Sequence, residues 1–397
     1  MAGHGKNSPE LDTVPKSSGT EYALSSAMDR WRESGNETGE FRQKLTIPRP
    51  WRPTPDEIEV QASYHFQRTA EGHRLGATID GHRVPLDRPV RLQPVQIPKP
   101  WGKEIWYTGI EARGESRIET DTGSLPLSQY LALAPRLLYG HAPLTLLKIL
   151  APRPEPVLGD LYFEMHEIKQ EVYVVTHVDQ GAWPGGTGGI RFGMNQAARR
   201  RYGSDAAFRS AFLAAVKAYE TVRRAIDDAT AAPDPGMRSR EARLRTAMER
   251  FSNIEPLNVG DVVVVPTRVP HSLQHGVRVV EFQTPTYERQ IISFAQRVLT
   301  QSHWDSDTAI RNMRLDPPSP PSFETIAPGW QRLVTFEDFS VWRAQVTSGD
   351  TVSLPNHPSY VICMAVGGAI QLGPLELAAE QAAFVPGWLL RSSPKGA

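Results

Sequence analysis

Hydrophobic and polar residues alternate with a period of two over much of this chain, as they do in strands that bury one face. The alternation is clear in EIEVQASYHF (residues 57–66) and in HRLGATIDGHRVPL (residues 73–86), where the pair Asp80–Gly81 is typical of a hairpin turn. Short β segments return between residues 257 and 294 and again after residue 324. The pattern predicts a mainly β protein built from antiparallel barrels rather than a doubly wound α/β sheet.

A helical segment interrupts this β pattern. Between residues 195 and 253, apolar residues recur at helical spacing, and Ser204 with Asp205 offers a helix cap ahead of them. Because β segments lie on both sides, we expect a helical insertion within a β domain. The apolar residues that recur are Phe208, Phe212, Val216, Tyr219, Val222 and Ile226.

The composition argues against several classes of function. Lysine and arginine number 44, and so do aspartate and glutamate, so no net charge favours nucleic acid or an anionic membrane. No apolar run approaches the ~18 residues of a membrane span, and the amino-terminal residues lack the apolar core of a secretory signal. We therefore expect a soluble, cytoplasmic protein without a nucleic-acid or membrane partner. The sequence does not indicate its oligomeric state.

The stretch LYFEMHEIKQEVYVV (residues 161–175) places three potential metal ligands in a strand–turn–strand pattern. Glu164 and His166 are two residues apart and share one face of a strand, while a tight turn can fold Glu171 back toward them. The later run GDVVVVPTRVPH ends at a fourth, His271. Two carboxylates and two imidazoles suit Zn²⁺ first, with Mn²⁺, Fe²⁺, Ni²⁺ or Co²⁺ as alternatives. An exposed charged ribbon would explain the first three residues but not the second motif.

The two stretches read Glu-x-His-x4-Glu and Gly-x5-Pro-x4-His, which resembles the two-part signature of the cupin barrel. A wider set of segments occurs in an order that resembles type I phosphomannose isomerase (mannose-6-phosphate isomerase). This similarity covers roughly residues 98–294, and a weaker similarity continues toward the C-terminus. The segments that carry it are KPWGKEIWYTG, LSQYLALAPRLL, PLTLLKIL, KQEVYVV, VGDVVVVPTRVPH and VVEFQTPTYERQ.

The resemblance implies an activity and a set of site residues. The activity is isomerisation of a sugar phosphate between aldose and ketose through a cis-enediol, with mannose 6-phosphate and fructose 6-phosphate as the first pair to test. One divalent metal, zinc first, is the implied cofactor. The implied metal ligands are Glu164, His166, Glu171 and His271. The implied catalytic residues are Lys148 and Arg289, and the implied substrate-binding residues are Trp101 and Lys169.

The sequence departs from the family pattern at three places. The family's glutamine is Glu164 here, which adds a negative charge to the metal site. Only four residues separate His166 from Glu171, because the family's His-Pro-Asp extension and longer loop are absent. The segment before Arg289 reads Thr-Tyr-Glu-Arg, one residue out of register with Thr-Tyr-Arg. Two other functions therefore stay open: an Fe²⁺ cupin oxygenase, and a non-catalytic sugar-binding or regulatory cupin.

We expect the chain to be divided as follows. Residues 1–45 are polar and lack a sustained period, so we expect a disordered tail. A metal-binding cupin barrel is expected from residues 46–194 and 254–314, interrupted by the helical insertion at 195–253. A proline-rich linker at 315–323 then leads to a smaller cupin-like half at 324–397.

Overall fold

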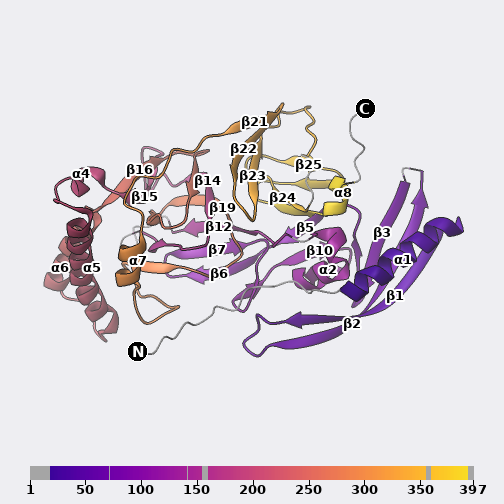
Figure 1. Ribbon diagram of the computed structural model, residues 1–397, viewed down its shortest axis with the longest axis horizontal. Helices are drawn as coiled ribbons and strands as arrows, with labels where there is room; N and C mark the ends of the chain where they lie inside the picture. Colours follow the sequence, from indigo (N-terminus) through magenta and orange to yellow (C-terminus); the bar gives the residue numbers. More distant parts are fainter. Residues whose placement is uncertain (1–17, 71, 141, 154–159, 355–358, 392–397) are drawn as a thin grey trace.

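The computed structural model describes residues 18–70, 72–140, 142–153, 160–354 and 359–391. The molecule is elongated, with helix α1 and strands β1–β3 at one end and helices α5 and α6 at the other (Figure 1). Antiparallel sheets fill the length between them. The structure thus confirms the prediction of a mainly β, antiparallel protein that carries a helical segment.

The amino-terminal end is a four-stranded sheet of order β1-β2-β3-β4, with α1 packed against it. Helix α1 (Ser18–Ser34) buries Leu24, Ala27 and Trp31, which lie on one helical face. The expectation of a disordered tail over residues 1–45 is therefore wrong for residues 18–45, because a helix with so few apolar residues becomes stable only against its sheet. Residues 1–17 lie outside the described residues. The strands are β1 (Thr38–Arg49), β2 (Asp56–Thr69), β3 (Gly72–Ile79) and β4 (His82–Pro85).

A second sheet joins residues from both halves of the chain, in the order β11-β10-β5-β27-β24. All four residues of β27 are buried, so this strand needs a neighbour on each side; β24 lies on one side and β5 on the other. The expected division is therefore wrong here, because residues 90–93 and 117–126 share a sheet with the C-terminal segment. The strands are β5 (Val90–Gln93), β10 (Arg117–Thr120), β11 (Gly123–Pro126), β24 (Val361–Met364) and β27 (Ala382–Val385).

Two further sheets enclose one hydrophobic core and carry every residue of the expected metal motifs in or next to their strands. The first has the order β17-β14-β19-β12-β7-β6 and the second β16-β15-β18-β13-β20. The first contains β6 (Val95–Lys99), β7 (Gly102–Trp106), β12 (Leu146–Pro152), β14 (Glu171–Val178), β17 (Val262–Val265) and β19 (Val277–Gln283). The second contains β13 (Phe163–Met165), β15 (Gly188–Met194), β16 (Ser252–Leu257), β18 (His271–Leu273) and β20 (Gln290–Ser293).

The helical segment lies between β15 and β16 and covers one end of the molecule (Figure 1). Ser204 caps its main helix by accepting a hydrogen bond from the backbone N–H of Ala207 (3.1 Å). The apolar face predicted from helical spacing is buried, as Phe208 and Phe212 illustrate. The helices are α4 (Gln196–Arg199), α5 (Asp205–Asp228) and α6 (Pro235–Glu249), and α7 (Ser306–Asn312) packs nearby.

Short elements complete the fold. A small three-stranded sheet, β21-β22-β23, follows the proline-rich segment. Within the described residues, no helix has both the length and the hydropathy to cross a membrane. The remaining elements are β8 (Ile110–Glu111), β9 (Gly114–Glu115), α2 (Leu127–Leu133), α3 (Pro135–Leu138), β21 (Glu324–Ala327), β22 (Trp330–Thr335), β23 (Ser340–Ala344), β25 (Ile370–Leu372), β26 (Leu375–Leu377) and α8 (Gly387–Arg391).

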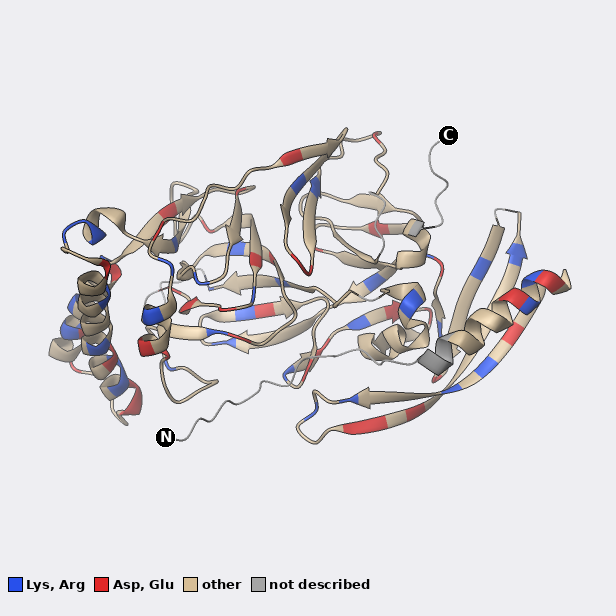
Figure 2. Ribbon diagram, viewed as in Figure 1, with Lys and Arg blue, Asp and Glu red and all other residues tan. Residues whose placement is uncertain are grey.

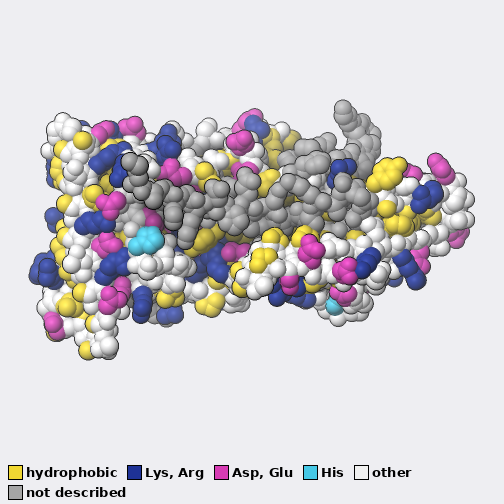
Figure 3. Space-filling view, turned by 60° about the horizontal axis from the view of Figure 1, so that its bottom comes forward, with side chains coloured by type: hydrophobic (Ala, Val, Ile, Leu, Met, Phe, Trp, Pro, Cys, Tyr) yellow, Lys and Arg dark blue, Asp and Glu magenta, His cyan; other side chains and the backbone are white. Residues whose placement is uncertain are grey.

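Charged side chains of both signs follow the end helices α5 and α6 and the ribbon of α1, β1 and β2 (Figure 2). On the face shown in Figure 3, basic and acidic side chains are interspersed and do not gather into a patch of one sign. An interspersed pattern of this kind does not attract a polyanion to that face.

Candidate metal centre and its pocket

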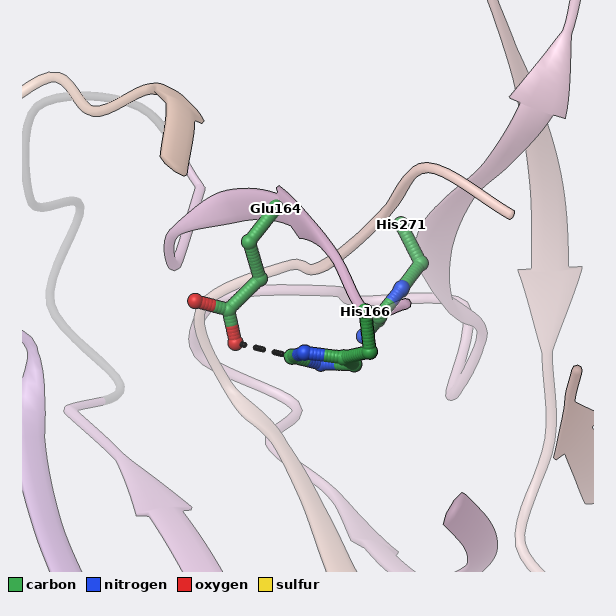
Figure 4. A group of neighbouring side chains, drawn as sticks. All are labelled: Glu164, His166 and His271. Carbon is green, nitrogen blue, oxygen red and sulfur yellow. Dashed lines mark ion pairs between the residues drawn. The ribbon is translucent and has the colours of Figure 1, made fainter. Parts of the chain in front are cut away.

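Strand pairing brings the first and last of the predicted ligands together. Glu164 lies in β13, and its backbone pairs with that of His271, the first residue of β18. His166 follows β13 directly and turns its imidazole toward the same point (Figure 4). One potential ligand atom from each of these three residues lies within 4.8 Å of the other two. The structure therefore forms a buried Glu/His/His group from segments more than a hundred residues apart.

Backbone carbonyls orient both imidazoles. His166 Nδ1 is 2.8 Å from the carbonyl oxygen of Glu288, and His271 Nδ1 is 3.0 Å from that of Val269. A carbonyl can only accept, so each Nδ1 donates, and in the neutral imidazole Nε2 then keeps its lone pair. His166 Nε2 is buried and has no hydrogen-bond partner among the described residues. A buried nitrogen in that condition is suited to a bound cation.

Glu171, the first residue of β14, lies against both histidines. Its Oε1 is 3.4 Å from His166 Nε2 and its Oε2 is 3.1 Å from His271 Nε2. A carboxylate oxygen and an imidazole nitrogen at such separations are ligand types that divalent zinc accepts. Glu171 also accepts a hydrogen bond from the Tyr173 hydroxyl (2.6 Å) and pairs with Lys169 Nζ (2.5 Å). Glu171 thus lies beside the Glu/His/His group and faces each imidazole with a different carboxylate oxygen.

The protonation tendencies of the two histidines differ. Burial, helped by the charge of Lys169, holds the pKa of His166 well below its usual value, which favours the neutral ligand form. Burial would also lower the pKa of His271, but the hydrogen bond to Glu171 and the charges of Glu171 and Glu164 together outweigh burial and raise that pKa. A metal ion must therefore compete with a proton at His271 more than at His166.

A cavity of about 90 Å³, partly open to solvent, lies beside the candidate centre. Glu164 lines it, and so do three of the residues that the resemblance assigned to catalysis or substrate binding. Those three are Lys148, Lys169 and Arg289. The guanidinium of Arg289 also lies 4.3 Å from the centroid of the Tyr162 ring, which fixes its direction.

The five basic side chains that line this cavity are all paired with acids. Two of the pairs use carboxylates of the candidate metal ligands, so a divalent ion there would weaken the hold of Glu164 on Arg289 and of Glu171 on Lys169. The pairs are Lys99 with Glu104 (3.1 Å), Arg113 with Glu111 (2.7 Å), Lys148 with Glu281 (3.2 Å), Lys169 with Glu171 (2.5 Å) and Arg289 with Glu164 (3.4 Å).

Trp101 is not brought to the cavity. It lies in the turn between β6 and β7, is 2% exposed and packs in the hydrophobic core. Trp106, at the end of β7, lines the cavity instead and donates from its indole N–H to Glu104 (2.8 Å). The sequence assignment selected the tryptophan of the Trp-Gly pair, whereas the strand geometry places the later one beside the site.

Sequence reasoning also missed Glu281, which faces Lys148 across the pair β12 and β19. It is 1% exposed, and neither of its carboxylate oxygens has a hydrogen-bond partner among the described residues. The available signal was a lone carboxylate in the apolar run VVEFQ, the same kind of signal that singled out Lys148 in PLTLLKIL.

Burial and neighbouring charges together determine the pKa values of Glu281, Glu104 and Lys148. Burial raises the pKa of Glu281 well above its usual value, against the charge of Lys148. Burial also opposes ionisation of Glu104, but Lys148 and Lys99 outweigh it and lower the pKa of Glu104 to about 2. For Lys148, the charges of Glu104 and Glu281 outweigh burial and raise its pKa. Lys148 thus stays cationic, Glu104 stays ionised and Glu281 tends to keep its proton.

These features define a mainly β protein with a buried Glu/His/His candidate metal site beside a cavity lined by paired cations. Solved structures that match this fold include type I phosphomannose isomerases. Mannose 6-phosphate isomerase from Bacillus subtilis matches with a TM-score of 0.55 at 16% identity, over 76% of this chain and 95% of that chain. A zinc-bound mannose 6-phosphate isomerase matches with a TM-score of 0.56 at 13% identity, over the same shares.

A variant of phosphomannose isomerase from Salmonella typhimurium matches similarly, with a TM-score of 0.55 at 13% identity, over 76% of this chain and 95% of that one. At such identities the likeness establishes the fold. No protein-family model matches the sequence, and no curated protein matches it.

Proposed function

We propose that the protein is a metal-dependent aldose–ketose isomerase that acts on a sugar phosphate, with mannose 6-phosphate and fructose 6-phosphate as the first pair. The observation that carries this proposal is the position of the Glu/His/His group, which opens through Glu164 into a cavity lined by Lys148, Lys169 and Arg289. The proposal assumes that the two sheets around it act together as a cupin barrel. The fold shared with mannose 6-phosphate isomerases supports the same reaction class.

The proposed division of labour follows from the charges. Glu164, His166, Glu171 and His271 would hold one divalent ion, zinc first, which would polarise the carbonyl and hydroxyl oxygens of a bound sugar. Lys148 remains cationic and would stabilise the negative charge that develops on the enediolate. Arg289, aligned on Tyr162 at the cavity wall, would bind the phosphate or share in that stabilisation.

Glu281 is the carboxyl group best suited to move the proton between C1 and C2. Burial raises its pKa well above the usual value and so favours the protonated form, which general acid catalysis requires. It lies behind Lys148, whose Nζ is 3.2 Å from its Oε2 and lines the cavity. Glu281→Gln should therefore lower turnover by ~10²–10⁴ while the metal is retained.

The test is proton exchange at C1 and C2 of hexose and pentose phosphates in D₂O, followed by NMR with metal-loaded protein. Arg289→Ala should reduce the exchange rate by ~10²–10³ and leave metal content unchanged. Arg117→Ala, which alters an exposed arginine on β10, is the matched control and should be neutral. Absence of exchange on every sugar phosphate would overturn the proposal and favour the Fe²⁺ oxygenase or the non-catalytic sugar-binding cupin.

A further inference from the structure

The loop that carries His166 is held by hydrogen bonds from its backbone to another segment of the chain. Residues 166–170 connect β13 to Glu171 without forming a strand or a helix. A loop this short cannot satisfy its own backbone N–H groups by internal hydrogen bonds, so acceptors must come from elsewhere. The segment between β19 and β20, residues 284–289, lies beside the loop and supplies them.

One side chain satisfies three successive amides of the loop. The carboxylate of Glu288 accepts from the backbone N–H of Glu167 (2.9 and 3.0 Å), of Ile168 (3.1 Å) and of Lys169 (3.3 Å). The hydroxyl of Thr284 accepts from the next amide, that of Gln170 (3.2 Å). Such a set of hydrogen bonds from one carboxylate holds the loop backbone in a single conformation.

The same residue also orients the ligand itself. The backbone carbonyl of Glu288 accepts from His166 Nδ1 (2.8 Å), which leaves Nε2 directed at the candidate metal position. Glu288 is therefore linked to His166 twice, through the imidazole and through the loop that follows it.

We propose that Glu288 is a positioning residue for the metal centre, because its carboxylate holds the loop between His166 and Glu171 and its carbonyl orients His166. The inference rests on the metal centre of the proposed function. It does not depend on which sugar the protein binds.

The test compares zinc affinity among purified, metal-free proteins by competition with a chromogenic chelator. Glu288→Ala should weaken zinc binding by ~10–100-fold, the usual cost of losing a residue that orients a metal ligand. Glu288→Gln keeps one acceptor oxygen and should fall between Glu288→Ala and the wild type. Glu57→Ala, at an exposed position on β2, is the control and should bind zinc like the wild type.

Hydrogen exchange supplies a readout that needs no metal. The amides of residues 167–169 should exchange faster in Glu288→Ala and Glu288→Gln than in the wild type, with the core strands unchanged. Wild-type zinc affinity in both folded variants would overturn the inference and leave the proposed function intact. A wild type that binds zinc but isomerises no sugar phosphate would overturn only the proposed function. A wild type that binds no divalent ion would overturn both.

Discussion

Two parts of the molecule have the same antiparallel construction but bury different side chains. They are the two sheets around the candidate metal centre and the sheet shared by the two halves of the chain. Behind the cavity, Lys148, Glu281 and Glu171 are each less than a tenth exposed. In the shared sheet, β27 is wholly apolar, and Phe384 stacks on Tyr360 (5.4 Å between ring centroids) and meets Tyr130 edge-on (6.0 Å).

This difference indicates which buried side chains serve the candidate chemistry and which stabilise the fold. Burying a charge costs free energy even when it is paired, and replacing a buried pair by apolar residues is often neutral or stabilising. A region that retains several buried charges therefore keeps them for another reason, here the candidate chemistry. The shared sheet follows the ordinary rule, since its buried Tyr360 hydroxyl donates to the carbonyl of Pro143 (2.6 Å).

The largest expected effect is loss of the metal. His271→Ala removes a ligand whose Nε2 faces Glu171, so metal content should fall from about one ion per chain to background in elemental analysis. The control is His177→Ala, an exposed histidine on β14, which should keep its metal. Full occupancy in His271→Ala would show that the ion lies elsewhere.

A truncation in the shared sheet should lower the stability of the fold and leave zinc binding unchanged. Phe384→Ala removes a fully buried ring between two tyrosines and should lower the free energy of unfolding by ~3–5 kcal/mol in urea titrations. Zinc affinity of the folded variant should stay at the wild-type value. A joint loss of stability and zinc affinity would show that the two regions are energetically coupled.

The pH dependence of the free energy of unfolding should show whether Glu281, the buried carboxyl behind the cavity, is protonated in the folded protein. Because the folded state raises the pKa of Glu281, it binds that proton more tightly than the unfolded chain does. Wild-type stability should therefore fall, relative to Glu281→Gln, as pH rises from about 4.5 toward the raised pKa, by at most ~1.4 kcal/mol per pH unit. Below the unfolded pKa the two metal-free proteins should be equally stable. Parallel curves across this range would mean that Glu281 is ionised in the fold.

The smallest expected effect concerns the charge of the metal centre. Two carboxylates and two neutral imidazoles balance a divalent ion, whereas Glu164→Gln leaves a net positive site. Zinc binding should weaken roughly tenfold, which corresponds to about 1.4 kcal/mol, and the bound ion should be a stronger Lewis acid. Unchanged affinity and unchanged turnover would mean that Glu164 points away from the ion.

Local sequence patterns predicted part of the fold and of the candidate site, because these features depend on residues that are close in the sequence. The period of two between Glu164 and His166 predicts a shared strand face, and helical spacing predicts the apolar face that α5 buries. The turn at Asp80–Gly81 has φ angles of 47° and 80°, the left-handed values that the pair favours. Each of these features depends on neighbours within a few residues.

Only the tertiary structure decided which distant strands pair, and that choice placed the rest of the site. An alternating strand shows which face is buried but not which strand lies beside it. The pairing of β12 with β7 and β19 brings Lys148 beside Trp106 and Glu281, and the pairing of β5 with β27 joins the two halves of the chain. The contact of Glu288 with the ligand loop arises in the same way, because 119 or more residues separate the carboxylate from the amides it holds.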